Sequence, residues 1–199
     1  MEDGPAFAII EQRYQVSRPA QGQCGRTHRV TAAVEMLRRK WYQLTMDAFV
    51  PIGFVRSTRT VVEDDNWDAV SAYIQLDASR FSPHALQGLQ DFSHVEIVFL
   101  LDRVDPDKVE RGARRPRNNP AWPEVGIFAQ RAKNRPNRIA TTVCRVFRVH
   151  QLELHVAGLD AIDGSPVLDI KPWVIELGPR GPVHQPEWMS QLMREYWRR

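Results

Sequence analysis

The stretch His94-Val95-Glu96-Ile97-Val98-Phe99-Leu100-Leu101 decides the fold class, because it is an almost unbroken apolar run. Such a run is typical of a central strand that is covered on both sides. Two further strands are expected at 141–149 and 152–156, and His150-Gln151 between them indicates a hairpin turn. In the second arm, apolar and polar side chains alternate, so one face is expected to be buried.

Helical patterns are scarce in the middle of the chain. Between Phe49 and Trp173 only residues 83–89 have one, while 49–57 and 71–76 are expected to be strands. There is no alternation of strands and helices, and no Gly-x-Gly-x-x-Gly follows a strand. The sequence therefore predicts a mainly β fold and disfavours a doubly wound nucleotide-binding fold.

Three segments are expected along the 199 residues. Residues 1–47 lack strand alternation and form an extension, which is either disordered or an incorrectly assigned start if translation begins at Met46. Residues 48–176 form the β domain. Residues 177–199 contain a Gly- and Pro-rich linker and an amphipathic helix that begins near Pro186.

Composition indicates a protein of the cytoplasm. Apolar residues make up 43% of the chain, which is enough for one core. No apolar run approaches the length of a membrane span, and the N-terminus does not resemble a secretion signal. Cys24 and Cys144 offer no disulfide framework and no metal-ligand spacing, so we expect no membrane contact and no metal.

Positive charge is concentrated in one part of the chain. Residues 103–148 contain twelve Lys or Arg and four Asp or Glu, a balance of +8 within a total of +3. Arg111-Gly112-Ala113-Arg114-Arg115-Pro116-Arg117 lies there, shortly before Trp122. This combination suits a phosphate backbone and an unstacked base, although a solvated loop would have the same composition.

Two dense motifs carry the chemistry. In the run from Ala157 to Trp173, Asp160 and Asp163 lie at the rim of an Asp-Gly turn, and Asp169 interrupts an apolar strand. Such a rim could hold a cation or the hydroxyls of a ribose. In the run from Val125 to Ala140, a short strand leads into a loop with four cations, and its Arg side chains suit a carboxylate or phosphate.

Together with Gly88-Leu89-Gln90-Asp91-Phe92-Ser93-His94-Val95-Glu96-Ile97-Val98-Phe99, these motifs resemble the YaeB/TrmO-like (TsaA-like) family of S-adenosylmethionine-dependent tRNA methyltransferases. In that family a "GLEDFSHIWVLF" strand precedes a "GVFATRS..RPNPIG" loop and a "DLLDGTPVLDIKPY" turn, in the same order as here. The resemblance covers residues 49–173.

The resemblance implies a small single-sheet β-barrel, here followed by a C-terminal helix, and a homodimer. It also implies methylation of threonylcarbamoyl-modified adenosine beside the tRNA anticodon, with S-adenosyl-L-methionine as methyl donor. Carried over residue by residue, it places the cofactor at Asp102, Arg103, Arg131, Thr141, Asp160, Ala161, Ile162 and Asp163. Arg135, Asn137 and Arg138 are then expected to contact RNA, and Asp102 to deprotonate or orient the acceptor.

The chain departs from the family pattern at two places. Arg138 and Ala140 replace a proline and a glycine, and Asn66-Trp67-Asp68 stands where relatives have a Pro-Arg-Gln element. The replacements at Arg138 and Ala140 suggest a first alternative, the same cofactor with another acceptor. Two further alternatives remain open: a non-catalytic RNA-binding barrel, and a metal-dependent hydrolase built on Asp160, Asp163 and Asp169.

Overall fold

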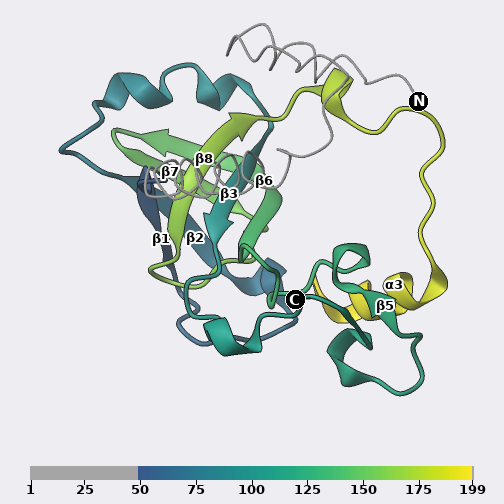
Figure 1. Ribbon diagram of the computed structural model, residues 1–199. Coiled ribbons are helices and arrows are strands. Elements are labelled where there is room, and N and C mark those ends of the chain that lie inside the picture. The colour runs from purple at the N-terminus through teal and green to yellow at the C-terminus, as the bar shows by residue number, and fades with distance from the viewer. Residues whose placement is uncertain (1–48, 199) are drawn as a thin grey trace, which may run out of the picture. The chain divides into compact units, whose positions relative to one another are not determined.

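Six antiparallel strands close into a barrel in the order β1-β2-β7-β6-β3-β8 (Figure 1). The structure is a computed structural model that describes residues 49–198, so the predicted N-terminal extension lies outside the described residues. The barrel strands are β1 (Gly53–Ser57), β2 (Ser71–Leu76), β3 (His94–Leu100), β6 (Ile139–His150), β7 (Glu153–Ala157) and β8 (Pro166–Pro172). The predicted mainly β, single-sheet barrel is confirmed.

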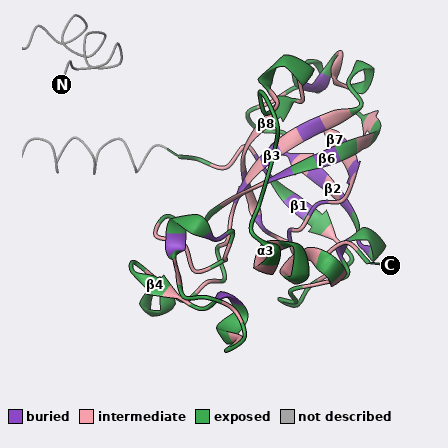
Figure 2. Cartoon of the chain, turned by 90° about the vertical axis from the view of Figure 1, so that its right-hand side faces the viewer, coloured by how far each residue is buried: buried purple, intermediate pink, exposed green. Residues whose placement is uncertain are grey.

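The strand β3 begins at the predicted residue but has only one buried face. Val95, Ile97 and Phe99 are fully buried, whereas the residues between them are half-buried. The expectation that both faces are covered was wrong, because a closed sheet has a single interior and its outer wall meets solvent (Figure 2). The strand expected at 49–57 is likewise shorter and begins at Gly53.

The hairpin between β6 and β7 turns where predicted. Gln151 adopts the left-handed conformation with φ 51°, which lets the two strands connect tightly. Leu154 and Val156 of β7 point into the core, as their alternation predicted. With Ile74 and Val167 from β2 and β8, these side chains form part of one continuous core inside the barrel.

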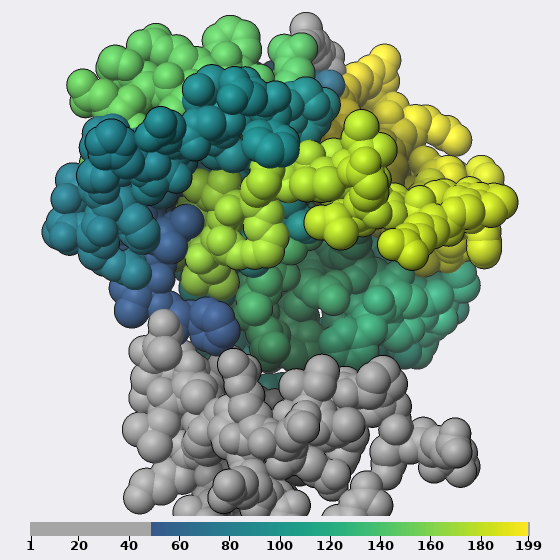
Figure 3. Space-filling view, turned by 90° about the horizontal axis from the view of Figure 1, so that it is seen from above, coloured from purple at the N-terminus to yellow at the C-terminus, as the bar shows by residue number. Residues whose placement is uncertain are grey.

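One end of the barrel is covered by the connection between β2 and β3. Residues 77–93 run over this end beside the β6–β7 turn, as Figure 3 shows in teal and green. Leu86 of this segment is buried, and Phe81 and Leu89 pack against the core. The helix predicted at 83–89 is instead two short 3-10 helices, Pro83–Leu86 and Leu89–Asp91, separated by Gly88 with φ 83°.

The opposite end of the barrel gathers three loops. Because neighbouring strands are antiparallel, the β1–β2 loop (58–70), the β3–β6 connection (101–138) and the β7–β8 loop (158–165) all emerge there. The long connection contains the small sheet of β4 (Ala113–Arg114) and β5 (Val125–Gly126). All residues predicted to bind the cofactor or RNA lie at this end, which we call the loop end.

The C-terminal segment returns to the loop end after β8. Residues 178–187 are largely exposed, and they lead to α3 (Glu187–Leu192) and a 3-10 helix (Met193–Glu195). The amphipathic helix is thus shorter than predicted; α3 has no buried residue and no side-chain cap. No helix within residues 49–198 is long and apolar enough to cross a membrane.

Candidate cofactor and substrate site at the loop end

Asp160 lies at the centre of the first group of predicted residues. Thr142 of β6 donates its hydroxyl hydrogen to Oδ1 of Asp160, and Tyr196 donates its phenolic hydrogen to Oδ2. Thr142 is buried, while Asp160 and Tyr196 are half-buried. Each carboxylate oxygen therefore has a neutral donor from a different part of the chain, which fixes the direction of the carboxylate.

The electrostatic surroundings of Asp160 raise the pKa of two neighbours. Burial, followed by the negative charge of Asp160, raises the pKa of the Tyr196 hydroxyl well above its ordinary value, so Tyr196 remains a neutral donor. The positive charges of Arg131 and Arg117 oppose this rise. Burial and Asp160 also raise the pKa of the Cys144 thiol, which is fully buried and free.

Arg131 lies beside this group. Its Nη2 donates to the carbonyl oxygen of Thr141 and, over 3.4 Å, to the hydroxyl of the same residue. Thr141 precedes Thr142 on β6, so the contacts of Arg131 with Thr141 and of Thr142 with Asp160 involve neighbouring residues of one strand. Arg131 itself is exposed, which leaves a guanidinium at the surface of the loop end.

Arg103 and Asp163 form a second group. Arg103 donates from Nη1 to the carbonyl of Thr60 (2.9 Å) and from Nη2 to the carbonyl of Asp163 (3.1 Å). Oδ1 of Asp163 accepts the backbone N–H of Ser57 at 3.1 Å, so this side chain joins the β7–β8 loop to the end of β1. Gly164 has φ 83°, the left-handed conformation expected of the Asp-Gly turn.

Three other predicted residues contribute differently. Asp102 is exposed, immediately after β3 and next to Arg103. Ala161 is only 2% exposed and belongs to the barrel core, so its side chain packs inside the protein. Ile162 is half-buried, and its carbonyl accepts the N–H of Ser165 within the turn. Of these residues, Asp102 presents its side chain to solvent.

The residues predicted to contact RNA lie in the loop before β6. Arg138 donates from Nη1 to the carbonyl of Val104 (3.0 Å), and its own carbonyl accepts the N–H of Leu101. Arg135 donates to the carbonyl of Gln130, while Asn137 is exposed. Both arginines therefore also hold the backbone of the loop.

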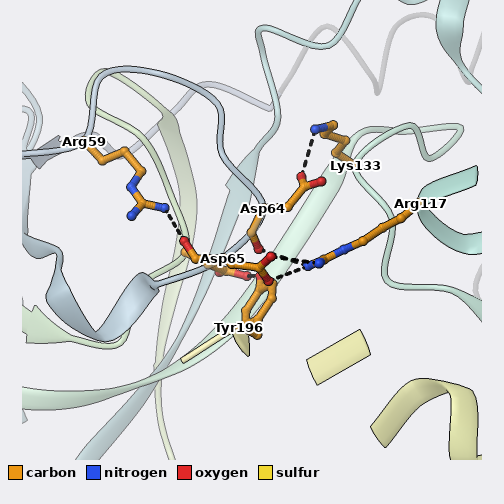
Figure 4. A network of polar contacts seen from close by, with 7 residues as sticks. Arg59, Asp64, Asp65, Arg117, Lys133 and Tyr196 are labelled. Atoms are coloured by element: carbon orange, nitrogen blue, oxygen red, sulfur yellow. Dashed lines mark hydrogen bonds and ion pairs between the residues drawn. The ribbon is translucent and has the colours of Figure 1, made fainter. Parts of the chain in front are cut away.

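An ionic network beside Tyr196 joins the β1–β2 loop to the long connection (Figure 4). Asp65 accepts both terminal nitrogens of Arg117, at 2.8 and 2.6 Å, and Asp64 accepts Nζ of Lys133 at 3.0 Å. The hydrogen bonds to Asp65 hold the pKa of Arg117 above its usual value. Arg59 supports this loop by donating to the carbonyl of Asp65 at 2.8 Å.

Sequence reasoning missed Thr142, Tyr196 and Arg117 as parts of this region. Thr142 reads as an ordinary strand residue, and Tyr196 reads as part of a helix stripe. Trp122, which follows the basic run in the sequence, is half-buried, and its Nε1 donates to Oε1 of Gln191 at 2.9 Å. Asp169, the third aspartate of the acidic run, forms an ion pair with Lys171. Within residues 49–198, no group of three or more His, Cys, Asp or Glu is arranged to hold a metal ion.

Comparison with known sequences places these features in a family. The profile of the tRNA-methyltransferase O N-terminal domain matches residues 58–178. A tRNA (adenine(37)-N6)-methyltransferase of Homo sapiens is 36% identical over 103 residues, which cover 52% of this chain and 23% of the relative. A probable S-adenosyl-L-methionine-binding protein of Methanothermobacter thermautotrophicus is 35% identical over 136 residues, 66% of this chain and 93% of the relative.

Solved structures agree with the sequence matches. The crystal structure of TrmO from Pseudomonas aeruginosa superimposes with a TM-score of 0.52 at 29% identity, covering 67% of this chain and 58% of that one. Another TrmO crystal structure gives 0.54 at 30% identity, covering 68% and 61%. The chain thus spans about a quarter of the human relative and nearly all of the archaeal one. It belongs to the family of tRNA-methyltransferase O N-terminal domains.

Proposed function

We propose that this chain is an S-adenosylmethionine-dependent methyltransferase that methylates N6 of threonylcarbamoyl-modified adenosine beside the tRNA anticodon. The observation that carries the proposal is the family match over residues 58–178, which contains both groups of predicted residues at the loop end. The human tRNA (adenine(37)-N6)-methyltransferase supports the acceptor, and the archaeal probable S-adenosyl-L-methionine-binding protein supports the cofactor.

The donors at the loop end fit the proposed cofactor. Asp160 accepts hydrogen bonds only from hydroxyl groups within residues 49–198, so its negative charge can face a cation or hydroxyl groups of the cofactor. Arg131 is placed to bind a carboxylate through its exposed guanidinium. Arg103 and Asp163 fix the turn that carries Asp160. When bound, S-adenosylmethionine supplies a methyl group that a positively charged sulfur already activates.

We assign catalysis mainly to the positioning of the acceptor against the methyl group, and we assign the proton transfer to Asp102. Methyl transfer forms an N6–carbon bond and breaks a sulfur–carbon bond, and N6 then loses a proton. Asp102 is exposed at the end of β3 beside Arg103, where a carboxylate can orient or accept that proton. Aligning the acceptor with the methyl group accounts for most of the expected acceleration.

For RNA, we assign Arg135, Asn137 and Arg138, which share one loop beside Arg131. We also propose that the chain acts as a homodimer in the cytoplasm, where its proposed tRNA acceptor is found. The outer face of β6 supports a dimer, because Val143 and Phe147 are 41% and 74% exposed there. Apolar side chains on an outer barrel wall suit an interface with a second copy.

The test is transfer of a labelled methyl group from S-adenosylmethionine to tRNA with and without the threonylcarbamoyl modification. We expect label on N6 of the modified adenosine only, and a loss of rate for Asp102→Asn. Calorimetry with Arg131→Ala and Asp163→Ala should show at least about tenfold weaker cofactor binding. Absence of cofactor binding by the wild type at millimolar concentration contradicts the proposal and leaves an RNA-binding barrel.

One observation favours a different acceptor as the second candidate. Arg138 has φ 53°, a backbone conformation that the proline of the family pattern cannot adopt. At Arg138, the backbone conformation of the loop assigned to RNA therefore differs from the one that the family's proline requires. Label on another nucleoside, with intact cofactor binding, would establish this alternative.

A further inference from the structure

The C-terminal segment reaches the loop end although it lies outside the family match, which stops at residue 178. Two backbone hydrogen bonds attach it to the β1–β2 loop. Asn66 donates its N–H to the carbonyl of Glu195 at 3.2 Å, and Trp67 donates to the carbonyl of Tyr196 at 2.9 Å. We call residues 187–198 the C-terminal strap.

Side chains attach the strap at three further points. Tyr196 donates to Asp160, and Gln191 accepts from Nε1 of Trp122 in the long connection. A Cβ atom placed on Gly158 would lie 3.9 Å from Cζ3 of Trp197, so the indole lies against the start of the β7–β8 loop. The strap therefore contacts all three loops that form the loop end.

The partners of Asp160 show what this attachment does. Among residues 49–198, no Lys, Arg or His nitrogen lies within 4 Å of its carboxylate, whereas Asp64 and Asp65 have such partners. A hydroxyl donor orients a carboxylate without cancelling its charge. Tyr196 stays protonated and gives its one hydrogen to a single carboxylate oxygen, so the Asp160 carboxylate retains acceptor capacity for a ligand.

We propose that Tyr196 is a positioning residue, and that the C-terminal strap completes the cofactor site by holding the Asp160 carboxylate between Tyr196 and Thr142. Tyr196 acts through Asp160 and need not touch the cofactor itself. The inference rests on the proposed function, since it assigns Asp160 to S-adenosylmethionine. It extends the site to a part of the chain that the family match does not include.

The test compares Tyr196→Phe with Tyr73→Phe. Tyr196→Phe keeps the ring and removes only the donor to Asp160. Tyr73 is a matched control, because it lies on β2 and stacks on His155 at a ring distance of 4.9 Å. We expect Tyr196→Phe to raise the dissociation constant of S-adenosylmethionine about fivefold and to lower the unfolding midpoint only slightly, since one hydrogen bond to a charged group is lost. Tyr73→Phe should leave both unchanged.

A second readout needs no cofactor. Hydrogen exchange at the backbone N–H groups of Asn66 and Trp67 reports whether the strap is attached, and we expect faster exchange in Tyr196→Phe. If Tyr196→Phe binds S-adenosylmethionine as tightly as the wild type does, the inference is overturned and the proposed function stays intact. If the wild type does not bind S-adenosylmethionine, both the proposed function and the role of Tyr196 are contradicted. In either case, equal hydrogen-exchange rates at Asn66 and Trp67 in Tyr196→Phe and the wild type would show that Tyr196 does not anchor the strap.

Discussion

Two groups of aspartates lie at the same end of the barrel and have partners of opposite kinds. Asp64 and Asp65 are paired with Lys133 and Arg117, which cancel their charges and tie two loops together. Asp160 is held by the hydroxyls of Thr142 and Tyr196, which leave its charge in place. Under the proposed function, the carboxylate that has only neutral donors is the one that binds a ligand, while the ion-paired carboxylates stabilise the structure.

The largest expected effect separates the two groups by cofactor affinity. Asp160→Asn should weaken S-adenosylmethionine binding at least about tenfold, or about 1.4 kcal/mol, because it removes the uncompensated charge. Asp65→Asn is the matched control and should leave the affinity unchanged, since its partner is Arg117. Calorimetry at one pH and salt concentration measures both. Equal losses in the two variants would end the distinction between the groups.

The ion-paired group should instead contribute to stability. Arg117→Ala removes a two-point contact with Asp65 in which both side chains are less than a third exposed. We expect the free energy of unfolding to fall by about 1 kcal/mol, as for a well-formed, partly exposed ion pair. Denaturant unfolding measures the loss, and Arg111→Ala, an exposed arginine of the same connection, serves as a control. An unchanged unfolding energy, or a loss of cofactor affinity, would contradict the structural role.

These differences between the groups were not readable from the sequence. Strand alternation located β2, β3 and the β6–β7 hairpin to within a few residues, because one buried face imposes a period of two. The Asp-Gly turn and the Arg131 loop were also recognised from local sequence, the turn from its residue types and the loop from its clustered cations. By contrast, Tyr196 meets Asp160 across 36 positions, and Arg117 meets Asp65 across 52. Only the closed barrel and the returning C-terminal segment bring such pairs together.

The ion pairs should also moderate RNA binding. Replacing Asp64 and Asp65 together with Asn releases Lys133 and Arg117, and we expect severalfold tighter binding of tRNA at low salt. The slope of log affinity against log salt should steepen by about 1.4 if both cations then reach phosphates, taking the single-strand coefficient. Filter binding over a range of salt concentrations measures it, with Asp68→Asn as the control. An unchanged slope would show that neither cation faces RNA.

The smallest effect concerns pH and belongs to the hydroxyl-bonded group. Burial and Asp160 raise the pKa of Tyr196 in the folded protein, so the folded state keeps its proton at a pH where the unfolded chain loses it. The stability that Tyr196 contributes is therefore complete below the ordinary tyrosine pKa of about 10 and declines as the pH rises above it. Unfolding of the wild type and Tyr196→Phe, compared between pH 7 and 11, should show a constant difference up to about pH 9 and a shrinking one beyond. A difference that grows with pH would mean that Tyr196 is held as the anion, and that Asp160 is not its partner in solution.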